Sequence, residues 1–224
     1  MRTSPVAHAL SARRAQFAPF RGMPCAIVVN DDDATRAAMA GICDLSALER
    51  CGLKGAGAAA WLQSNGVVVS EGANTFAPLP GGGLVARLAR TEFLVEDGPD
   101  DAVVSVLRPL LRAGLPKVTP VLRQDCALAL VGSRIPELLV ETCNVDFASL
   151  SPDAAVVTLT QMVGVSVTVV RRDIGGRAGV RVWCDYTSGP YLWETLVGIA
   201  EELGGGAVGT AAAWPRLTET MDRQ

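Results

Sequence analysis

Two stretches of this chain read alike, and this internal duplication constrains the fold more than any single residue does. The first is LKGAG at residues 53–57, the second is LVGSR at residues 130–134, and an apolar run follows each of them. Each stretch reads as a strand that ends on a glycine and leads into a short helix. Because two more strand-like stretches and a longer amphipathic helix follow in both cases, the sequence predicts the order β-α-β-β-α twice.

This repeated order predicts an α+β fold in which helices pack on mostly antiparallel sheets. We expect the first half-unit at residues 43–113 and the second at residues 114–206. Residues 1–42 are expected to form an N-terminal arm and a short helix, and residues 207–224 a loosely held tail.

Aspartates mark the predicted starts of two helices. Asp33 precedes an apolar run at 34–40, and Asp100 precedes an amphipathic stretch at 103–111. Because a carboxylate there can accept hydrogen bonds from the first free amides of a helix, we expect both residues to be N-caps. The helix that closes the second half-unit is predicted from an apolar stripe of Leu192, Leu196, Ile199 and Leu203.

Composition argues against several classes of partner. The 224-residue chain has a net charge of −3 and 19% charged residues, which gives no electrostatic basis for binding nucleic acid or an anionic membrane. Its longest apolar stretch, residues 162–170, is far too short to cross a bilayer. With 49% apolar residues and a mean hydropathy of +0.29, the chain is expected to bury surface against partner proteins.

The cysteines and the single histidine do not form a recognisable reactive or metal-binding motif. No CxxC pair occurs, so we expect no metal site. A cysteine nucleophile would need a histidine base, and His8 lies in the predicted N-terminal arm. The apolar surroundings of most cysteines favour reduced, buried thiols in a cytoplasmic protein. The six are Cys25, Cys43, Cys51, Cys126, Cys143 and Cys184.

Several short strings, taken in order, resemble the aminomethyltransferase superfamily. FAPFRGMP at 17–24 and GICDLS at 41–46 are similar to strings near the start of the glycine-cleavage T-protein. LARTEFL at 88–94, CNVDF at 143–147 and SGPYLW at 188–193 are closer to the gamma subunit of heterotetrameric sarcosine oxidase. The resemblance implies the two-half fold of this superfamily, here without the C-terminal barrel of a full T-protein.

The folate-dependent members imply an acidic group that this chain lacks at the matching place. The resemblance implies a carboxylate after a glycine pair on a hairpin of the first half, where it stabilises developing positive charge. Residues 81–84 read GGGL and supply no carboxylate. Asp97 and Gly98 stand where the resemblance implies an asparagine at the end of the following strand.

The second half departs from the resemblance as well. Folate-dependent members carry GYTGEDGFE, in which the tyrosine packs on the pterin and a glutamate accepts hydrogen bonds from it. Here residues 173–181 read DIGGRAGVR, so Ile174 replaces the tyrosine and Arg177 and Arg181 replace both glutamates. A guanidinium has only donors and cannot accept these hydrogen bonds. We expect both arginines to be exposed turn and strand-face residues, and contact with the carboxylates of a folate tail is the alternative.

The remaining polar and aromatic candidates for a functional site can also be explained by structural roles. Asp44 and Ser46 are expected to form a turn and cap pair rather than a catalytic pair. Trp183, Tyr191 and Trp193 suit either a core or a contact surface.

These departures indicate that the chain keeps the fold of the superfamily but has lost its folate site. Our hypothesis is a non-catalytic gamma-like subunit of a heteromeric, flavin-dependent sarcosine oxidase or N-methyl amino acid dehydrogenase linked to tetrahydrofolate one-carbon metabolism. By resemblance, partner subunits carry flavin and NAD, and no catalytic residue, cofactor-binding residue or metal ligand is assigned to this chain. The alternatives are a truncated, folate-dependent aminomethyltransferase, with tetrahydrofolate bound here, and a folate-binding regulatory protein.

Overall fold

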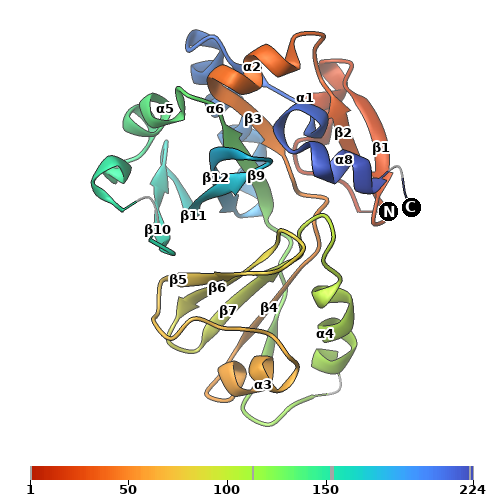
Figure 1. Cartoon of the computed structure of the whole chain (residues 1–224), viewed down its shortest axis with the longest axis vertical. Helices are drawn as coiled ribbons and strands as arrows, with labels where there is room; N and C mark the ends of the chain where they lie inside the picture. Colours follow the sequence, from red (N-terminus) through yellow and green to blue (C-terminus); the bar gives the residue numbers. More distant parts are fainter. Residues whose placement is uncertain (1, 113, 152–153, 222, 224) are drawn as a thin grey trace. The chain divides into compact units, whose positions relative to one another are not determined.

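The computed structural model describes residues 2–112, 114–151, 154–221 and 223 (Figure 1). Contacts divide the chain into two compact units, both of them discontinuous in sequence. Unit 1 comprises Met1–Ala47, Asp125–Ala154 and Leu159–Gln224, and unit 2 comprises Leu48–Gln124 and Ala155–Thr158. These units are defined by contacts and not by the repeat, so the half-unit boundaries expected from the sequence stay a prediction. Within the described ranges, no helix has the length and apolar character of a membrane span.

Unit 1 is built on a six-stranded sheet with the order β10-β11-β12-β9-β3-β13, of which Val157 and Thr158 in β10 cluster with unit 2. Neighbouring strands β11, β12, β9 and β3 pair antiparallel, whereas β13 runs parallel to β3. The strands are β3 (Gly41–Asp44), β9 (Cys126–Val131), β10 (Val157–Met162), β11 (Val165–Ile174), β12 (Arg177–Cys184) and β13 (Gly206–Ala207).

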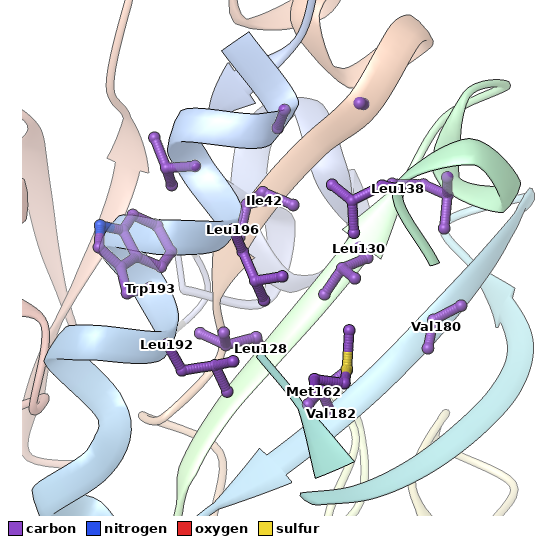
Figure 2. Packing of buried hydrophobic residues seen from close by; sticks show 14 of the residues in the cluster. Ile42, Leu128, Leu130, Leu138, Met162, Val180, Val182, Leu192, Trp193 and Leu196 are labelled. Atoms are coloured by element: carbon purple, nitrogen blue, oxygen red, sulfur yellow. The ribbon is translucent and has the colours of Figure 1, made fainter. Parts of the chain in front are cut away.

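Helices α5 (Ile135–Thr142) and α6 (Gly189–Glu202) supply apolar side chains to one face of this sheet. Alternate residues of the strands form that face, because successive side chains of a strand point to opposite sides. Figure 2 shows Leu192 and Leu196 of α6 directed at Leu128 of β9 and Ile42 of β3. The apolar stripe predicted for the closing helix is therefore its buried face.

The two ends of the chain are more ordered than the sequence predicts. The expected N-terminal arm contains helix α1 (Ala7–Ala12) and a hairpin of β1 (Gln16–Phe20) and β2 (Met23–Val28), followed by α2 (Asp33–Ala40). The expected loose tail forms α7 (Thr210–Ala213) and α8 (Pro215–Met221), which pack on β2 and β1. That expectation is wrong because Trp214 and Leu217 are buried and hold the segment in place.

Unit 2 contains a five-stranded antiparallel sheet with the order β5-β6-β7-β4-β8. Leu53 of β4 and Phe93 of β7 are fully buried in its core, together with Leu62 and Leu107 from the two helices. The elements are β4 (Arg50–Lys54), α3 (Ala58–Ser64), β5 (Thr75–Pro78), β6 (Leu84–Ala89), β7 (Glu92–Glu96), α4 (Val103–Arg112) and β8 (Thr119–Val121).

The strand order of the five-stranded sheet recurs in five of the six strands of the other sheet, and helices packed on mostly antiparallel sheets confirm the α+β class. Strands β5-β6-β7-β4-β8 match β10-β11-β12-β9-β3, and both sheets end on edge strands, so neither closes into a barrel. Each repeat has the order β-β-α-β-β-β-α, two strands more than predicted: an added first strand and a third strand between the two helices. The first strands are exchanged: β3 of the first repeat pairs with β9 of the second, and β8 of the second pairs with β4 of the first.

The glycine that ends the strand is equivalent in both repeats. Gly55 and Gly132 have φ values of 127° and 123°, a region that favours glycine. A Cβ atom added at Gly55 would overlap the carbonyl oxygen of Lys117, and one at Gly132 would overlap that of Met39. The residue two positions later donates its amide to that same carbonyl, at 3.0 Å in unit 2 and 2.8 Å in unit 1.

Gly198, in contrast, is a helical glycine without a structural need. It lies exposed in the middle of α6, with no atom within 4 Å of an added Cβ. Gly198→Ala should raise the free energy of unfolding by about 0.5–1 kcal/mol, because alanine restricts the unfolded chain and favours the helix. Urea denaturation followed by circular dichroism measures this change. Gly164→Ala is the matched control: its Cβ also meets nothing within 4 Å, but its φ of +84° makes the substitution destabilising.

Candidate functional site

In unit 2 the glycine loop at residues 81–83 surrounds a buried carboxylate that the sequence analysis missed. Asp101 is 6% exposed and accepts hydrogen bonds from three backbone amides. Gly81 donates to its Oδ1 at 2.7 Å, and Gly83 and Gly98 donate to its Oδ2 at 2.7 and 2.9 Å. Converging amides form an anion-binding concavity, and here the anion is the chain's own carboxylate.

Close backbone contact explains why glycines stand in this loop. An added Cβ would overlap backbone atoms of Asp101 at Gly81, of Glu96 at Gly83, and of Gly82 at Gly98. The three glycines are visible in the sequence. Their role is not, because it depends on Asp101, which follows the β6–β7 hairpin.

The neighbouring Asp97 is fully buried and has a structural role. Its Oδ1 accepts a hydrogen bond from the Val104 amide in the first turn of α4 at 3.0 Å. The Asp100 amide donates to the Gly81 carbonyl at 3.1 Å, and the expectation that Asp100 caps this helix stays a prediction. Asp97, which stands where the resemblance implies an asparagine, therefore caps the first turn of α4.

Asp33 in unit 1 departs from its expected role. Asp33 is the first residue of α2, and Asp32 before it occupies the N-cap position. Instead its carboxylate accepts the amides of Val29 at 2.9 Å, Asn30 at 2.9 Å and Gly209 at 2.8 Å. It therefore ties the end of β2 to the segment before α7, which is a second reason why the C-terminal residues are held.

The β11–β12 hairpin carries the second set of positions singled out by sequence. Gly175 and Gly176 form its turn with φ values of 63° and 81°, and Arg177 beside them is exposed, as expected. Ile174, which stands at the implied tyrosine position, is fully buried, and Gly179 lies against its side chain. The hairpin therefore directs Ile174 into the core of unit 1.

Arg181 does not lie on an exposed strand face, so the expectation for this residue is wrong. It is 1% exposed, its Nη1 donates to the Leu128 carbonyl at 3.4 Å, and its guanidinium lies 5.1 Å from the Trp183 ring. Register places it in one row with Ala129 and Cys43 on the sheet face opposite the α5–α6 side. That second face is buried as well, and a buried guanidinium can donate hydrogen bonds but accept none.

The six cysteines are buried and free, as predicted. Burial raises the pKa of the Cys51 thiol to about 12 and also raises those of Cys25 and Cys43, so these three thiols stay protonated at neutral pH. His8 lies exposed on α1. Among the described residues, no group of three or more histidine, cysteine or acidic side chains is placed to hold a metal ion.

Asp44 and Ser46 form the predicted turn pair. The Ser46 amide donates to Asp44 Oδ1 at 3.0 Å, and Ser46 Oγ accepts from the Ala127 amide at 3.1 Å. Both side chains are buried and support the passage from β3 toward β4.

The aromatic cluster is divided between core and surface. Trp193 belongs to the α5–α6 core (Figure 2), and Trp183 is buried beside Arg181. Tyr191 is 57% exposed, and its hydroxyl donates to the Val163 carbonyl at 3.3 Å. Of the three, Tyr191 is the one on the surface and suited to a contact.

Comparisons with known proteins give a family model and solved structures of the same fold. The model for the GCVT N-terminal domain matches residues 8–221. The glycine cleavage system aminomethyltransferase T from Bartonella henselae is similar with a TM-score of 0.73 and 18% identity, over 94% of this chain and 60% of that one. A chain of heterotetrameric sarcosine oxidase from Corynebacterium sp. U-96 is similar with a TM-score of 0.63 and 19% identity, over 93% of this chain and 99% of that one. This chain thus spans 60% of the aminomethyltransferase's length. A search of curated proteins found no match.

Proposed function

The chain belongs to the family of the GCVT N-terminal domain, and from this premise we propose that it is a non-catalytic subunit of a heteromeric, flavin-dependent enzyme. That enzyme oxidises an N-methyl amino acid such as sarcosine, and partner subunits carry the flavin and NAD. The observation that carries the proposal is the state of the carboxylate that the glycine loop surrounds: Asp101 is buried and already accepts three amide hydrogen bonds.

A pterin site needs acceptors at its amino-pyrimidine edge, and the residues at the implied positions do not fit that need. Arg177 and Arg181 offer donors only. Asp101 has its oxygens occupied by the backbone, and Ile174 is enclosed in the core of unit 1. Tetrahydrofolate therefore has no match at these positions, and we derive no reaction step from it on this chain.

Two further observations support a subunit role. The likeness to the chain of heterotetrameric sarcosine oxidase extends over 99% of that chain, compared with 60% of the aminomethyltransferase. Several large apolar side chains are also exposed and suited to contacts with other subunits. They include Val106 and Leu110 on α4, Val140 on α5, Leu159 on β10 and Tyr191 on α6. We place the complex in the cytoplasm, in keeping with free thiols.

The second candidate is a folate-dependent aminomethyltransferase, which the higher TM-score of 0.73 favours at the level of the fold. Titration calorimetry of the purified chain with tetrahydrofolate, kept free of oxygen, separates the two. We expect no saturable heat below about 1 mM ligand, because the acceptors that the pterin requires are missing. A folate-dependent aminomethyltransferase measured in the same buffer serves as the positive control.

A separate experiment tests whether the chain assembles with partner subunits. Expression of the chain together with flavoprotein reading frames adjacent to its gene should yield a stable complex by size exclusion and native mass spectrometry. Recovery of the chain as a monomer, together with tetrahydrofolate binding in the micromolar range, would contradict the proposal and support the aminomethyltransferase.

A further inference from the structure

Two cysteines lie directly opposite each other at one end of the six-stranded sheet. Cys126 is the first residue of β9, Cys184 is the last residue of β12, and the antiparallel register pairs them. Directly opposed residues of antiparallel strands have Cβ atoms about 4.5–5.5 Å apart and Cα atoms about 4.5–5.5 Å apart. A disulfide needs Cα atoms within about 4.4–6.8 Å and Cβ atoms about 3.5–4.5 Å apart, so only a small approach of the side chains is required.

The surroundings keep the two sulfur atoms together. The register directs both side chains to the same face of the sheet, and each thiol shifts the pKa of the other. An added Cβ at Gly189 would come within 2.9 Å of Cys126 Cβ and 3.1 Å of Pro5 Cβ, so Gly189 packs closely against Cys126. Cys126 is 0% exposed and Cys184 is 4% exposed. A small reagent can reach this buried pair only if the paired ends of β9 and β12 open locally.

The pair is chemically asymmetric. The neighbouring Cys126 thiol lowers the pKa of Cys184, although burial and the carboxylates of Asp185 and Asp125 act in the opposite direction. The Cys184 side chain and burial raise the pKa of Cys126. Cys184 therefore forms the thiolate first, and the thiolate is the reactive form of cysteine.

We propose that Cys126 and Cys184 are a redox-sensitive pair that a peroxide converts into a disulfide. The Cys184 thiolate attacks one peroxide oxygen, so that an S–O bond forms and the O–O bond breaks. The departing hydroxide takes up the proton that the thiol released and leaves as water. The Cys126 sulfur then attacks Cys184 sulfenic acid, the S–S bond replaces the S–O bond, and the Cys126 proton leaves with the hydroxide as a second water. Two thiols are oxidised by two electrons in total, and one peroxide is reduced to two waters.

The other cysteines do not offer the same arrangement. Cys25 and Cys43 influence each other electrostatically, but they belong to β2 and β3, which do not pair, and burial raises the pKa of both. Cys143 Sγ lies 3.8 Å from the Thr160 hydroxyl rather than beside a thiol. We therefore expect the reaction to be selective for one pair among the six cysteines.

Peptide mapping of the full chain tests this without any substitution. The purified protein is treated with a small excess of hydrogen peroxide, its remaining thiols are alkylated under denaturing conditions, and it is digested with trypsin. We expect loss of two alkylation sites, a mass decrease of two hydrogen atoms, and one linked peptide that joins residues 124–134 to residues 182–216. Dithiothreitol should restore both thiols.

Variants assign the order of attack. Cys184→Ser should protect Cys126 from peroxide, whereas Cys126→Ser should leave Cys184 to proceed to sulfinic acid because its resolving partner is absent. Cys51→Ser, in unit 2, is the matched control and should leave the linked peptide unchanged. Six intact thiols after treatment, equal loss from all cysteines, or a link between Cys25 and Cys43 instead would each overturn the proposal.

Discussion

Replacement of Asp101 by alanine should lower the free energy of unfolding by about 4 kcal/mol or more. The substitution leaves the amides of Gly81, Gly83 and Gly98 without their acceptor, and each orphaned buried donor costs about 1–3 kcal/mol. Chemical denaturation measures the loss, followed by far-UV circular dichroism. Against a typical stability of about 5–15 kcal/mol for a whole domain, this is one of the largest single-residue effects expected in the chain.

Two companion variants show whether the carboxylate itself is responsible. Asp101→Asn keeps one acceptor oxygen and places an NH2 group against the remaining donors, so it should also destabilise, though less than alanine. Asp31→Ala removes an exposed carboxylate and should change stability by less than about 0.5 kcal/mol. A wild-type midpoint for Asp101→Ala would mean that these amides are satisfied in some other way and would remove the main support for the proposed function.

Gly132→Ala should lower the free energy of unfolding by about 3 kcal/mol or more. Its φ of 123° is costly for an L-residue, and the added methyl group would overlap the Met39 carbonyl oxygen. That carbonyl cannot withdraw easily, because it accepts the Arg134 amide at 2.8 Å. Thermal and urea denaturation provide the measurement.

The matched control is Gly176→Ala, in the β11–β12 turn. Its φ of 81° carries a similar backbone strain, but no atom lies within 4 Å of the added Cβ. We expect a cost of about 1–2 kcal/mol there. Equal effects at Gly132 and Gly176 would show that the carbonyl contact contributes nothing, and the equivalence drawn between Gly132 and Gly55 would lose its physical basis.

Sequence periodicity predicted the parts of this fold that rest on local pattern. Leu192 and Leu196 in α6 form a helical stripe, and the structure buries both residues. The β11 and β12 strands follow from their β-branched runs in the same way. Strand β5 was missed because Pro78 and the glycines around it read as a loop, whereas its pairing with β6 makes it a strand.

The contacts and burial of individual side chains were harder to predict than the helices and strands. Asp33 looks like a helix cap in sequence and Asp101 was not singled out there, yet each carboxylate binds amides of a segment distant in sequence, which no local pattern encodes. Arg181 alternates with Val180 and Val182, which favours an exposed position on a half-buried strand. It is buried because the second face of the sheet is covered too, and that depends on segments far along the chain.

The exchange of first strands has a consequence for how such a chain arose and how it is made. A polypeptide with one copy of the repeat can complete this sheet only by receiving the first strand of another molecule, as in a strand-swapped dimer. Duplication within one gene turns that association into an intramolecular step that no longer depends on concentration. During synthesis, β3 can pair with β9, and β4 with β8, only after β9 and β8 have been made. Neither sheet can therefore be finished before the ribosome has begun the second repeat.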